Sequence, residues 1–427
     1  MSTISPDTGA LATPPSSRWN KTDTVWMFGL YATAVGAGTL FLPINAGLNG
    51  PLVLLLMALF AFPLTYLPHR ALSRFVLSGS SRDGNIHDVV VEHFGVLAGK
   101  IIMVLYLLAF FPIVLVYSIS ITNALDSFLI HQFHVTPPPR LWLSLAVVAV
   151  LNLVLLRGKD GIVAAMGMLV FPLLVFLMGI SLYLVPSWNT AHFTQGLMST
   201  QFDSPSLWHS LWLAVPVMVF SFSHAPIISS FASTQKSLYG DRAERRCARI
   251  MRYSYMLICV TVLFFVFSCV LSLSYQDMEQ AKAQNITVLT TLANKFSNPL
   301  IAYLGPIMAM LAMAKSYLGT SLGVTEGATS LIDGVTRALG KPLSSRTTHR
   351  VSALVLFLLT WAATVWNPSA LHIIETISGP LIAVILFILP MYAVRAVPSM
   401  HKYRALSNVF VLVMGLIALS ALIYGLM

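Results

Sequence analysis

Long apolar segments recur along the whole chain and are separated by short polar stretches. About 20 apolar residues form a helix long enough to cross the hydrocarbon core of a bilayer, which is about 30 Å thick. The pattern therefore predicts an all-α polytopic membrane protein with eleven transmembrane helices. The predicted spans are 24–45, 51–68, 101–124, 141–156, 162–185, 207–233, 253–274, 298–324, 350–366, 370–394 and 405–426.

The Lys and Arg residues concentrate in alternate connecting segments. With the N-terminus in the cytoplasm, 21 of the 25 Lys and Arg residues lie in cytoplasmic segments and three in outer loops, while Lys315 lies inside the eighth span. Positively charged loops stay on the cytoplasmic side of a membrane. The distribution predicts a cytoplasmic N-terminus and an outer C-terminus, and residues 1–22 are expected to form a disordered cytoplasmic tail.

Composition narrows the functional classes. The chain is 57% hydrophobic and 9% charged, so its net charge of +10 comes from loops between spans and indicates topology, not a nucleic-acid partner. The basic cluster at 241–252 is expected to contact anionic lipid headgroups. Cys247, Cys259 and Cys269 make no disulfide framework and no metal-ligand spacing, so we expect neither a metal nor a bound cofactor.

Two of the spans contain stretches that disfavour a continuous helix. Residues 33–43 read TAVGAGTLFLP, and residues 219–226 in the sixth span read VFSFSHAP. Irregular backbone at membrane depth persists only where it is buried in protein or lines a cavity. Two interrupted spans in corresponding places of the two halves indicate a transporter binding site. Close helix packing on small residues is the alternative explanation.

The positions of the two breaks also predict an internal symmetry. They lie in the first and sixth predicted spans, and a shift of five spans reverses the direction of the second copy. We therefore predict a 5+5 inverted repeat, with residues 23–190 as the first copy and 205–396 as the second. Residues 404–427 would add the eleventh helix. The halves share no clear sequence similarity, so the repeat rests on topology and on the paired breaks.

Broken helices expose the backbone groups that bind an amino acid. Free N–H groups at a helix N-terminus attract a carboxylate, and free C=O groups at a C-terminus attract an ammonium. The surrounding side chains are small, polar or aromatic and suit a compact zwitterion, although each hydroxyl can instead bond to its own helix. The candidate substrate-binding residues are Thr33, Gly36, Ala37, Gly38, Thr39, Tyr117, Phe220, Ser221, Phe222 and Ser223, and Ser120 is spaced to face the same cavity.

Three ionisable residues within the spans are candidates for proton transfer or gating. Lys315 places a charge at bilayer depth, which marks an ion or proton pathway unless the side chain snorkels to the surface. We expect its ammonium to bridge backbone carbonyls near Ala32 and Val35. His224 is the second candidate for proton transfer, with a structural hydrogen bond as the alternative. Glu375 lies near the outer end of its span, either as a gate or as a solvated residue at the helix entrance.

The chain resembles the hydroxy/aromatic amino acid permease family, and within it the serine transporter branch of enteric bacteria. The resemblance implies a LeuT-like inverted-repeat fold with eleven membrane helices, and uptake of serine or threonine with a proton. It implies that VGAG and FSFSH hold the substrate's carboxylate and ammonium, and that Lys315 stands where sodium-coupled members bind an ion. The stretches that carry it, between residues 21 and 421, are KTDTVWMFGLYATAVGAGTLFLPINAG, HRALSRFVLSG, VTPPPR, PVMVFSFSHAPIISSFA, FFVFSCVLSL, NPSALHIIETISGPLIA and SNVFVLVMGLIA.

We therefore expect a secondary active transporter, not an enzyme, that imports L-serine by alternating access with a proton as the coupling ion. Its place would be the bacterial inner membrane, and its partners the small amino acid and the membrane lipids, with no nucleic acid. Sodium coupling stays open, as do threonine, cysteine or D-serine as substrates and the oligomeric state. A membrane sensor of the same fold that does not transport is the alternative from another class.

Overall fold

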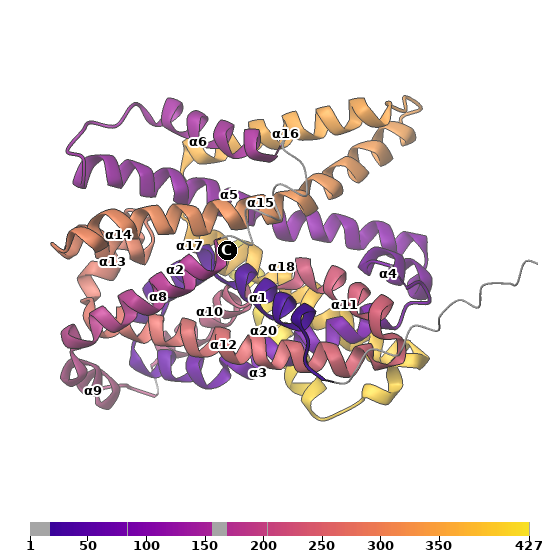
Figure 1. The fold of residues 1–427 in the computed structure, drawn as a ribbon, viewed down its shortest axis with the longest axis horizontal. Coiled ribbons are helices and arrows are strands. Elements are labelled where there is room, and N and C mark those ends of the chain that lie inside the picture. The colour runs from indigo at the N-terminus through magenta and orange to yellow at the C-terminus, as the bar shows by residue number, and fades with distance from the viewer. Residues whose placement is uncertain (1–17, 83, 156–168, 203, 427) are drawn as a thin grey trace, which may run out of the picture.

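The computed structural model describes residues 18–82, 84–155, 169–202 and 204–426, and within these ranges every regular element is a helix (Figure 1). Residues 1–17 of the predicted tail and 162–168 of the fifth predicted span lie outside the described residues. Each of the eleven predicted spans overlaps a helix over its described residues. These helices are α1 (Lys21–Ala34) with α2 (Ala37–Leu48), α3 (Pro51–Leu77), α5 (Val96–His131), α6 (Arg140–Leu155), α8 (Val170–Leu184), α10 (Pro205–Ser221) with α11 (Ala225–Tyr239), α12 (Ala243–Ser272), α15 (Pro299–Ala338), α16 (Ser345–Trp366), the segment Ala370–Ala396 and α20 (Ser407–Leu426).

The helices establish a multi-pass membrane protein. Among the described residues, eight helical segments are long and apolar enough to cross a bilayer, and nine if the bent pair α1 and α2 counts as one span. The helix α6 is shorter, with 16 residues. The helices α11 and α12 follow one another as a nearly continuous segment, Ala225–Ser272. The count of eleven crossings therefore stays a prediction.

Several short helices were not predicted. The helices α4 (Ile86–Phe94), α9 (Thr190–Met198), α13 (Tyr275–Ala283) and α14 (Val288–Lys295) each have at most nine residues. They are too short to register as membrane spans. Asn85 before α4 and Ser274 before α13 each form a capping box, in which two orphan N–H groups of the first turn are satisfied reciprocally.

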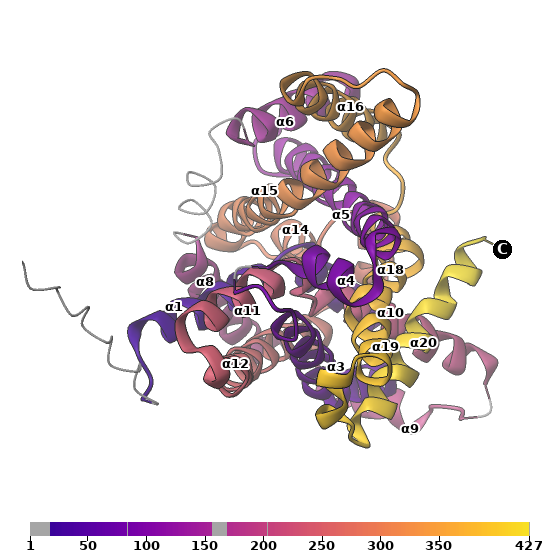
Figure 2. The same cartoon turned by 90° about the vertical axis from the view of Figure 1, so that its right-hand side faces the viewer.

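The long helices form two packed groups (Figures 1 and 2). In one group α15 runs along α5, and α16 packs against α6 and α15. In the other, α12 packs against α1 and α3, and α10 packs against α2 and α3. We call these the α5–α15 group and the α1–α12 group. Both broken helices, α1 with α2 and α10 with α11, belong to the α1–α12 group.

A buried ion pair fixes α1 to α12. Asp23, in the first turn of α1, is completely buried, and the Arg246 guanidinium donates to both of its carboxylate oxygens. Arg246 also donates to the backbone oxygen of Arg18 at 2.9 Å. The N-terminal end of the first broken helix is thus attached to α12 by charge-assisted hydrogen bonds, which are stronger than neutral ones.

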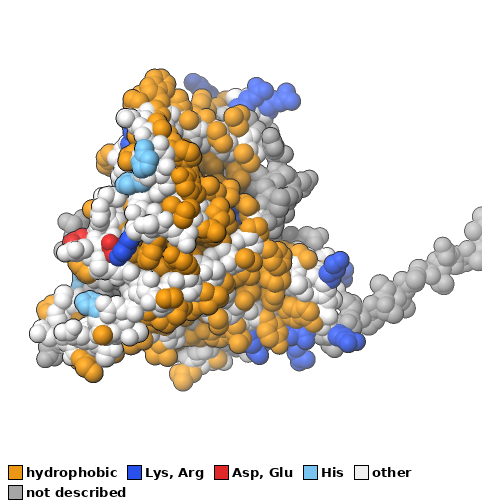
Figure 3. Space-filling model, turned by 60° about the vertical axis from the view of Figure 1, so that its left-hand side comes forward, with side chains coloured by type: hydrophobic (Ala, Val, Ile, Leu, Met, Phe, Trp, Pro, Cys, Tyr) orange, Lys and Arg blue, Asp and Glu red, His pale blue; other side chains and the backbone are white. Residues whose placement is uncertain are grey.

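One face of the molecule carries many exposed apolar side chains, as a lipid-facing surface requires (Figure 3). Figure 3 shows hydrophobic side chains in a broad band across one face, with most of the visible Lys and Arg side chains beyond one edge of it. Helices at the periphery carry the exposed large side chains, for example Leu358 and Trp366 of α16. This distribution fits a bilayer around the molecule.

Candidate functional site

The first break separates α1 from α2 by two residues and bends the chain by 52°. The helix α2 begins at Ala37, and Gly36 before it supplies no side-chain cap. The first backbone bond of α2 is from Leu40 N to Gly36 O, at 3.2 Å. The N–H groups of Ala37, Gly38 and Thr39 therefore have no partner among the described residues. An uncapped helix N-terminus of this kind is a site for a carboxylate.

Two glycines let this break touch its neighbours closely. A Cβ atom on Gly38 would lie 2.6 Å from the Cα of Ser221 in the second break. A Cβ atom on Gly36 would lie 2.7 Å from Ser316 Oγ and 3.3 Å from the Tyr117 hydroxyl. The glycines thus serve helix packing and at the same time bring the two breaks together. The packing explanation and the binding explanation do not exclude one another here.

The second break, between Ser221 and Ala225, has its backbone donors satisfied. The N–H groups of Phe222 and Ser223 donate to the last carbonyls of α10, at 3.0 and 3.2 Å. Ala225 N lies 3.4 Å from Ser223 Oγ. The N–H group of His224 donates to the ring atom Nε2 of His69, on α3, at 2.8 Å. The first turn of α11 consequently offers little to a carboxylate.

His69 was missed by the sequence analysis because the predicted second span ended at residue 68. The helix α3 continues to Leu77, and His69 is buried within it at 1% exposure. Its Nδ1 lies 2.6 Å from the backbone oxygen of Thr65, which can only accept. Nδ1 therefore carries the proton, and Nε2 is free to accept from His224.

A cavity of about 300 Å³ opens beside the two breaks. Most of the predicted residues line it: Thr33, Gly36, Gly38, Tyr117, Phe220, Ser221, Ser223, His224 and Lys315. Ser221 Oγ is buried there and has no hydrogen-bond partner among the described residues. The sequence analysis missed the wall that α15 contributes through Ser316, Gly319 and Thr320.

Other predicted residues lie behind the cavity wall. Ala37, Thr39, Phe222 and Ser120 are buried but are not part of the lining. The Thr39 hydroxyl donates to the backbone oxygen of Ala34 at 2.9 Å. The Thr33 hydroxyl, although on the lining, donates to Leu30 O at 2.8 Å. For both threonines the bond to their own broken helix is the observed role of the hydroxyl.

The cavity continues into a wider vestibule of about 670 Å³. The two share Phe110, Pro226, Ser230, Thr320 and Gly323 as lining residues. The vestibule extends between α5, α11 and α15 to the end of α15 at Ala338. A ligand in the cavity therefore has a route out toward that end of the helices.

Lys315 joins the two groups of helices at the first break. It is 2% exposed, so its ammonium does not reach the surface. Its Nζ donates to the backbone oxygen of Ala32 and, at 3.2 Å, to that of Val35, the carbonyls named in the sequence analysis. These carbonyls end α1 and have no helical partner, because α2 departs at an angle. The ammonium occupies a position that a small cation would suit.

Comparison with known proteins places the chain in a family. The model of the tryptophan/tyrosine permease family matches residues 25–425. The chain belongs to that family. The serine transporter SdaC of Escherichia coli (strain K12) is 50% identical to the permease over 412 residues, 96% of each chain. The inner membrane transport protein YqeG of the same strain is 41% identical over 413 residues, 96% of this chain and all of that protein.

A solved structure shows the same fold. The crystal structure of MhsT in complex with L-phenylalanine aligns with a TM-score of 0.60 and 16% sequence identity, over 96% of the permease and 99% of that chain. At this identity the likeness shows the fold alone, which is LeuT-like. The family resemblance is confirmed, and the names of the relatives confirm that the permease is a transporter and not an enzyme.

Glu375 lies away from the cavity, on a π-helical turn at Ile374–Ser378 between α17 (Ala370–Ile373) and α18 (Gly379–Ala383). It is 8% exposed, and its Oε1 accepts a hydrogen bond of 2.9 Å from Asn45 Nδ2 on α2. The expectation of a solvated residue at the helix entrance is therefore wrong. The contact ties the far end of α2 to the segment Ala370–Ala396.

An amide network closes the same end of the permease. Asn123 Nδ2 on α5 donates to Asn285 O at 2.8 Å and to Asn367 Oδ1 at 3.0 Å. Arg140 Nη1 donates to Asn123 Oδ1 at 2.8 Å. The network connects α5 with the α13–α14 turn and with the turn after α16. The permease is thus closed at one end of the site and open, through the vestibule, at the other.

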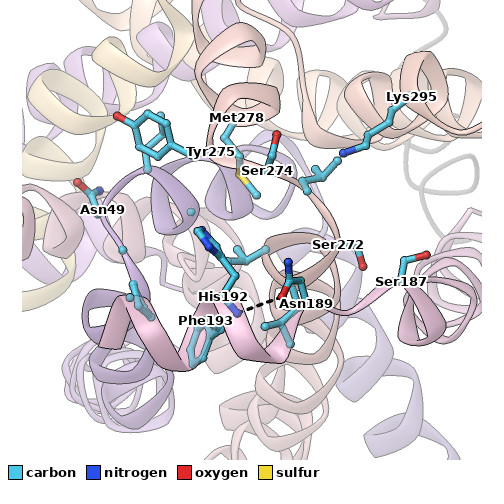
Figure 4. A pocket seen from close by; sticks show the side chains of 18 residues that line it. Asn49, Ser187, Asn189, His192, Phe193, Ser272, Ser274, Tyr275, Met278 and Lys295 are labelled. Atoms are coloured by element: carbon cyan, nitrogen blue, oxygen red, sulfur yellow. Dashed lines mark hydrogen bonds between the residues drawn. The ribbon is translucent and has the colours of Figure 1, made fainter. Parts of the chain in front are cut away.

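A second cavity, of about 590 Å³, lies beyond the closed end (Figure 4). Its polar groups already serve local structure: Asn189 Oδ1 accepts from His192 N, and Lys295 pairs with Asp277. Burial raises the pKa of Asp277, but hydrogen bonds from Lys295 and Ser274 lower it by more, so the carboxylate stays charged. Although this cavity is larger, no candidate site residue lines it. The cavity beside the two breaks is therefore the candidate site.

Proposed function

We propose that the permease imports L-serine together with a proton by alternating access. The observation that carries this proposal is the uncapped first turn of α2, whose Gly38 lines the same cavity of about 300 Å³ as Lys315 and Ser221. A volume of this size suits a small ligand. The 50% identity to the serine transporter SdaC supports serine as the substrate.

In this proposal the two breaks bind different groups of the amino acid. The carboxylate accepts from the N–H groups of α2, where the helix dipole favours negative charge. The ammonium donates to carbonyls at the end of α10. The side-chain hydroxyl reaches Ser221 Oγ, which otherwise lacks a partner. Threonine, cysteine and D-serine carry related groups and are the competing substrates.

Lys315 would couple transport to the proton. While charged, its ammonium holds the carbonyls of Ala32 and Val35 and so connects α1 to α15. Loss of the proton would remove that attraction and loosen the α1–α12 group from the α5–α15 group. An ammonium that stands in for a sodium ion makes the carrier independent of sodium. His224, which also lines the cavity, is the second candidate for the proton.

We further propose the membrane arrangement that the charge distribution predicts. The N-terminus lies in the cytoplasm of a bacterium, with eleven crossings of the inner membrane. Residues 23–190 and 205–396 form the inverted repeats, 404–427 the eleventh helix, and 1–22 the cytoplasmic tail. The vestibule then opens to the cytoplasm, and the contact of Glu375 with Asn45 closes the outer side. The name of the relative YqeG supports the inner membrane.

The test is transport by purified permease in liposomes. Counterflow against labelled L-serine, L-threonine, L-cysteine, L-alanine and D-serine identifies the substrate. An imposed inward proton gradient, with and without sodium, then measures accumulation. We expect accumulation of L-serine driven by the pH gradient alone. Accumulation that requires sodium would show that sodium, and not the proton, is the coupling ion. Binding without counterflow of any amino acid would indicate the non-transporting sensor.

A further inference from the structure

We propose that His69 is a positioning residue for the substrate cavity of the permease, acting through the backbone of His224. This inference deepens the proposed function, because the atoms that it places belong to the second break. His69 itself is not part of the cavity lining. His224, which caps the start of α11, does line the cavity.

The position of His224 N is determined from outside its own helix. A broken helix leaves the first N–H groups of its second half without intrahelical acceptors. Pro226 has no N–H group, and Ala225 N has only the long contact with Ser223 Oγ, at 3.4 Å. The short bond at this helix start is the one from His224 N to His69 Nε2, at 2.8 Å. His69 therefore decides where α11 begins relative to α3.

The orientation of the His69 ring is fixed at both nitrogen atoms. Nδ1 donates to Thr65 O one turn earlier on α3, and Nε2 accepts from His224 N. The ring also contacts the rings of His224 and Tyr255, with centroid distances of 5.1 and 5.2 Å. A side chain that only filled space would need neither nitrogen. The paired bonds indicate a hydrogen-bonding role.

A proton on Nε2 would reverse this contact. The nitrogen would become a donor, and two N–H groups would then point at each other. The titratable side chains that face His69 are His224 from α11 and Tyr255 from α12, and neither carries negative charge at neutral pH. The nearest acidic group on these elements, Glu244, is paired with Arg70 and Arg74 toward the end of α3. A proton on His69 would therefore find no acceptor here among the described residues, and its uptake at low pH should weaken the placement of α11.

Two substitutions test the roles of the two ring nitrogen atoms of His69 separately. In His69→Gln the side-chain oxygen can reach the place of Nε2 and accept from His224 N, but it cannot take up a proton. In His69→Asn the shorter amide can replace Nδ1 only. His192→Gln is the matched control, because His192 lies at the second cavity, away from the breaks.

The first measurement needs no amino acid. Amide hydrogen exchange of purified permease, followed on peptides that cover residues 222–230, should be faster in His69→Asn than in the unaltered protein and unchanged in His69→Gln. This readout stands even if the transported amino acid is not serine. Equal exchange in both variants would overturn the positioning role and would leave the proposed function untouched.

The second measurement is transport of the amino acid that counterflow selects. We expect KM to rise by about tenfold in His69→Asn and to stay within about twofold in His69→Gln, since a net hydrogen bond is worth up to one decade of affinity. With equal pH on both sides, KM of the unaltered permease should rise more steeply as the pH falls than KM of His69→Gln, because the proton-coupling residues remain in both proteins and only His69 can take up a further proton. A pH profile in His69→Gln identical to the unaltered one would contradict the proposal.

Discussion

The first and second breaks of the permease interrupt a membrane helix in the same way but leave different groups free. At the first break, the N–H groups of Ala37, Gly38 and Thr39 have no partner among the described residues, while the carbonyls of Ala32 and Val35 are held by Lys315. At the second break the donors are occupied, the most tightly by His69. The first break is thus prepared for a carboxylate, and the second is fixed by the protein itself.

The difference shows that two broken helices in one protein need not have the same role. Unsatisfied backbone groups are costly in a membrane unless protein or ligand completes them. The permease completes the carbonyls of one break and the donors of the other with side chains from α15 and α3. Among the described residues, the N–H groups at the start of α2, the hydroxyl of Ser221 and the ring nitrogens of His224 remain without a partner at the cavity. A zwitterion with a hydroxyl group matches that remainder.

The largest effect is expected from Gly38→Leu. A Cβ atom at this position would meet the backbone of Ser221 at 2.6 Å and the ring of Phe220, so the new side chain would separate the two breaks before it reached the ligand. Uptake should be abolished. Gly29→Ala on α1 is the control, because nothing lies within 4 Å of its added Cβ atom. Measurable uptake by membrane-inserted Gly38→Leu would contradict the inference that transport requires the close contact between the two breaks.

Loss of the ammonium at the first break comes next. Lys315→Ala should abolish accumulation of L-serine driven by a pH gradient and leave some exchange, because the cavity stays while the proton site is lost. Lys315→Arg should not restore accumulation, since a guanidinium does not release its proton in this range. Lys295→Ala, at the second cavity, serves as the control. Undiminished accumulation by Lys315→Ala would show that another residue carries the coupling proton, and His224 would be the next residue to test.

The hydroxyl at the second break should set selectivity. A site that bonds a substrate hydroxyl rejects the analogue without it more strongly than an apolar pocket rejects an added group. L-serine should therefore compete for uptake at about tenfold lower concentration than L-alanine, and Ser221→Ala should reduce this ratio. Inhibition curves with labelled L-serine measure it. Equal competition by L-alanine would indicate a general carrier of small amino acids.

The smallest effect is expected from Ser223→Ala. Ser223 Oγ makes only the 3.4 Å contact with Ala225 N, so its loss should change KM by about twofold, near the lower end for a hydrogen bond. Uptake kinetics measure the change. A loss as large as that of Ser221→Ala would mean that both hydroxyls contact the substrate.

Sequence reasoning found the features that local composition reveals. The glycines of the first break and the polar run of the second were enough to predict both interruptions. An isolated charge in an apolar span identified Lys315 as a candidate. The ends of the helices were harder to predict from the sequence. The second predicted span ends at residue 68, where the polar residues His69 and Arg70 follow the apolar run, although α3 continues to Leu77. That boundary concealed His69.

Contacts between distant segments could not be read from the sequence. Asn45 and Glu375 are 330 residues apart, and the bond between them decides that Glu375 is buried. The α15 wall of the cavity depends on the rotation of a 40-residue helix against α5, which apolar content on all sides does not specify. Residues such as Ser316 and Thr320 therefore became visible only in the assembled fold.

The ion pair between Asp23 and Arg246 limits how the first broken helix can move. Removing one partner of a buried pair typically costs about 3–5 kcal/mol, because a charge is left without compensation. A movement of α1 alone away from α12 would break the pair and carry that cost, since Asp23 is completely buried. A rotation that takes α1 and α12 together as a rigid body leaves the pair intact. The buried ion pair thus favours a rigid-body rotation of α1 together with α12 over a movement of α1 alone.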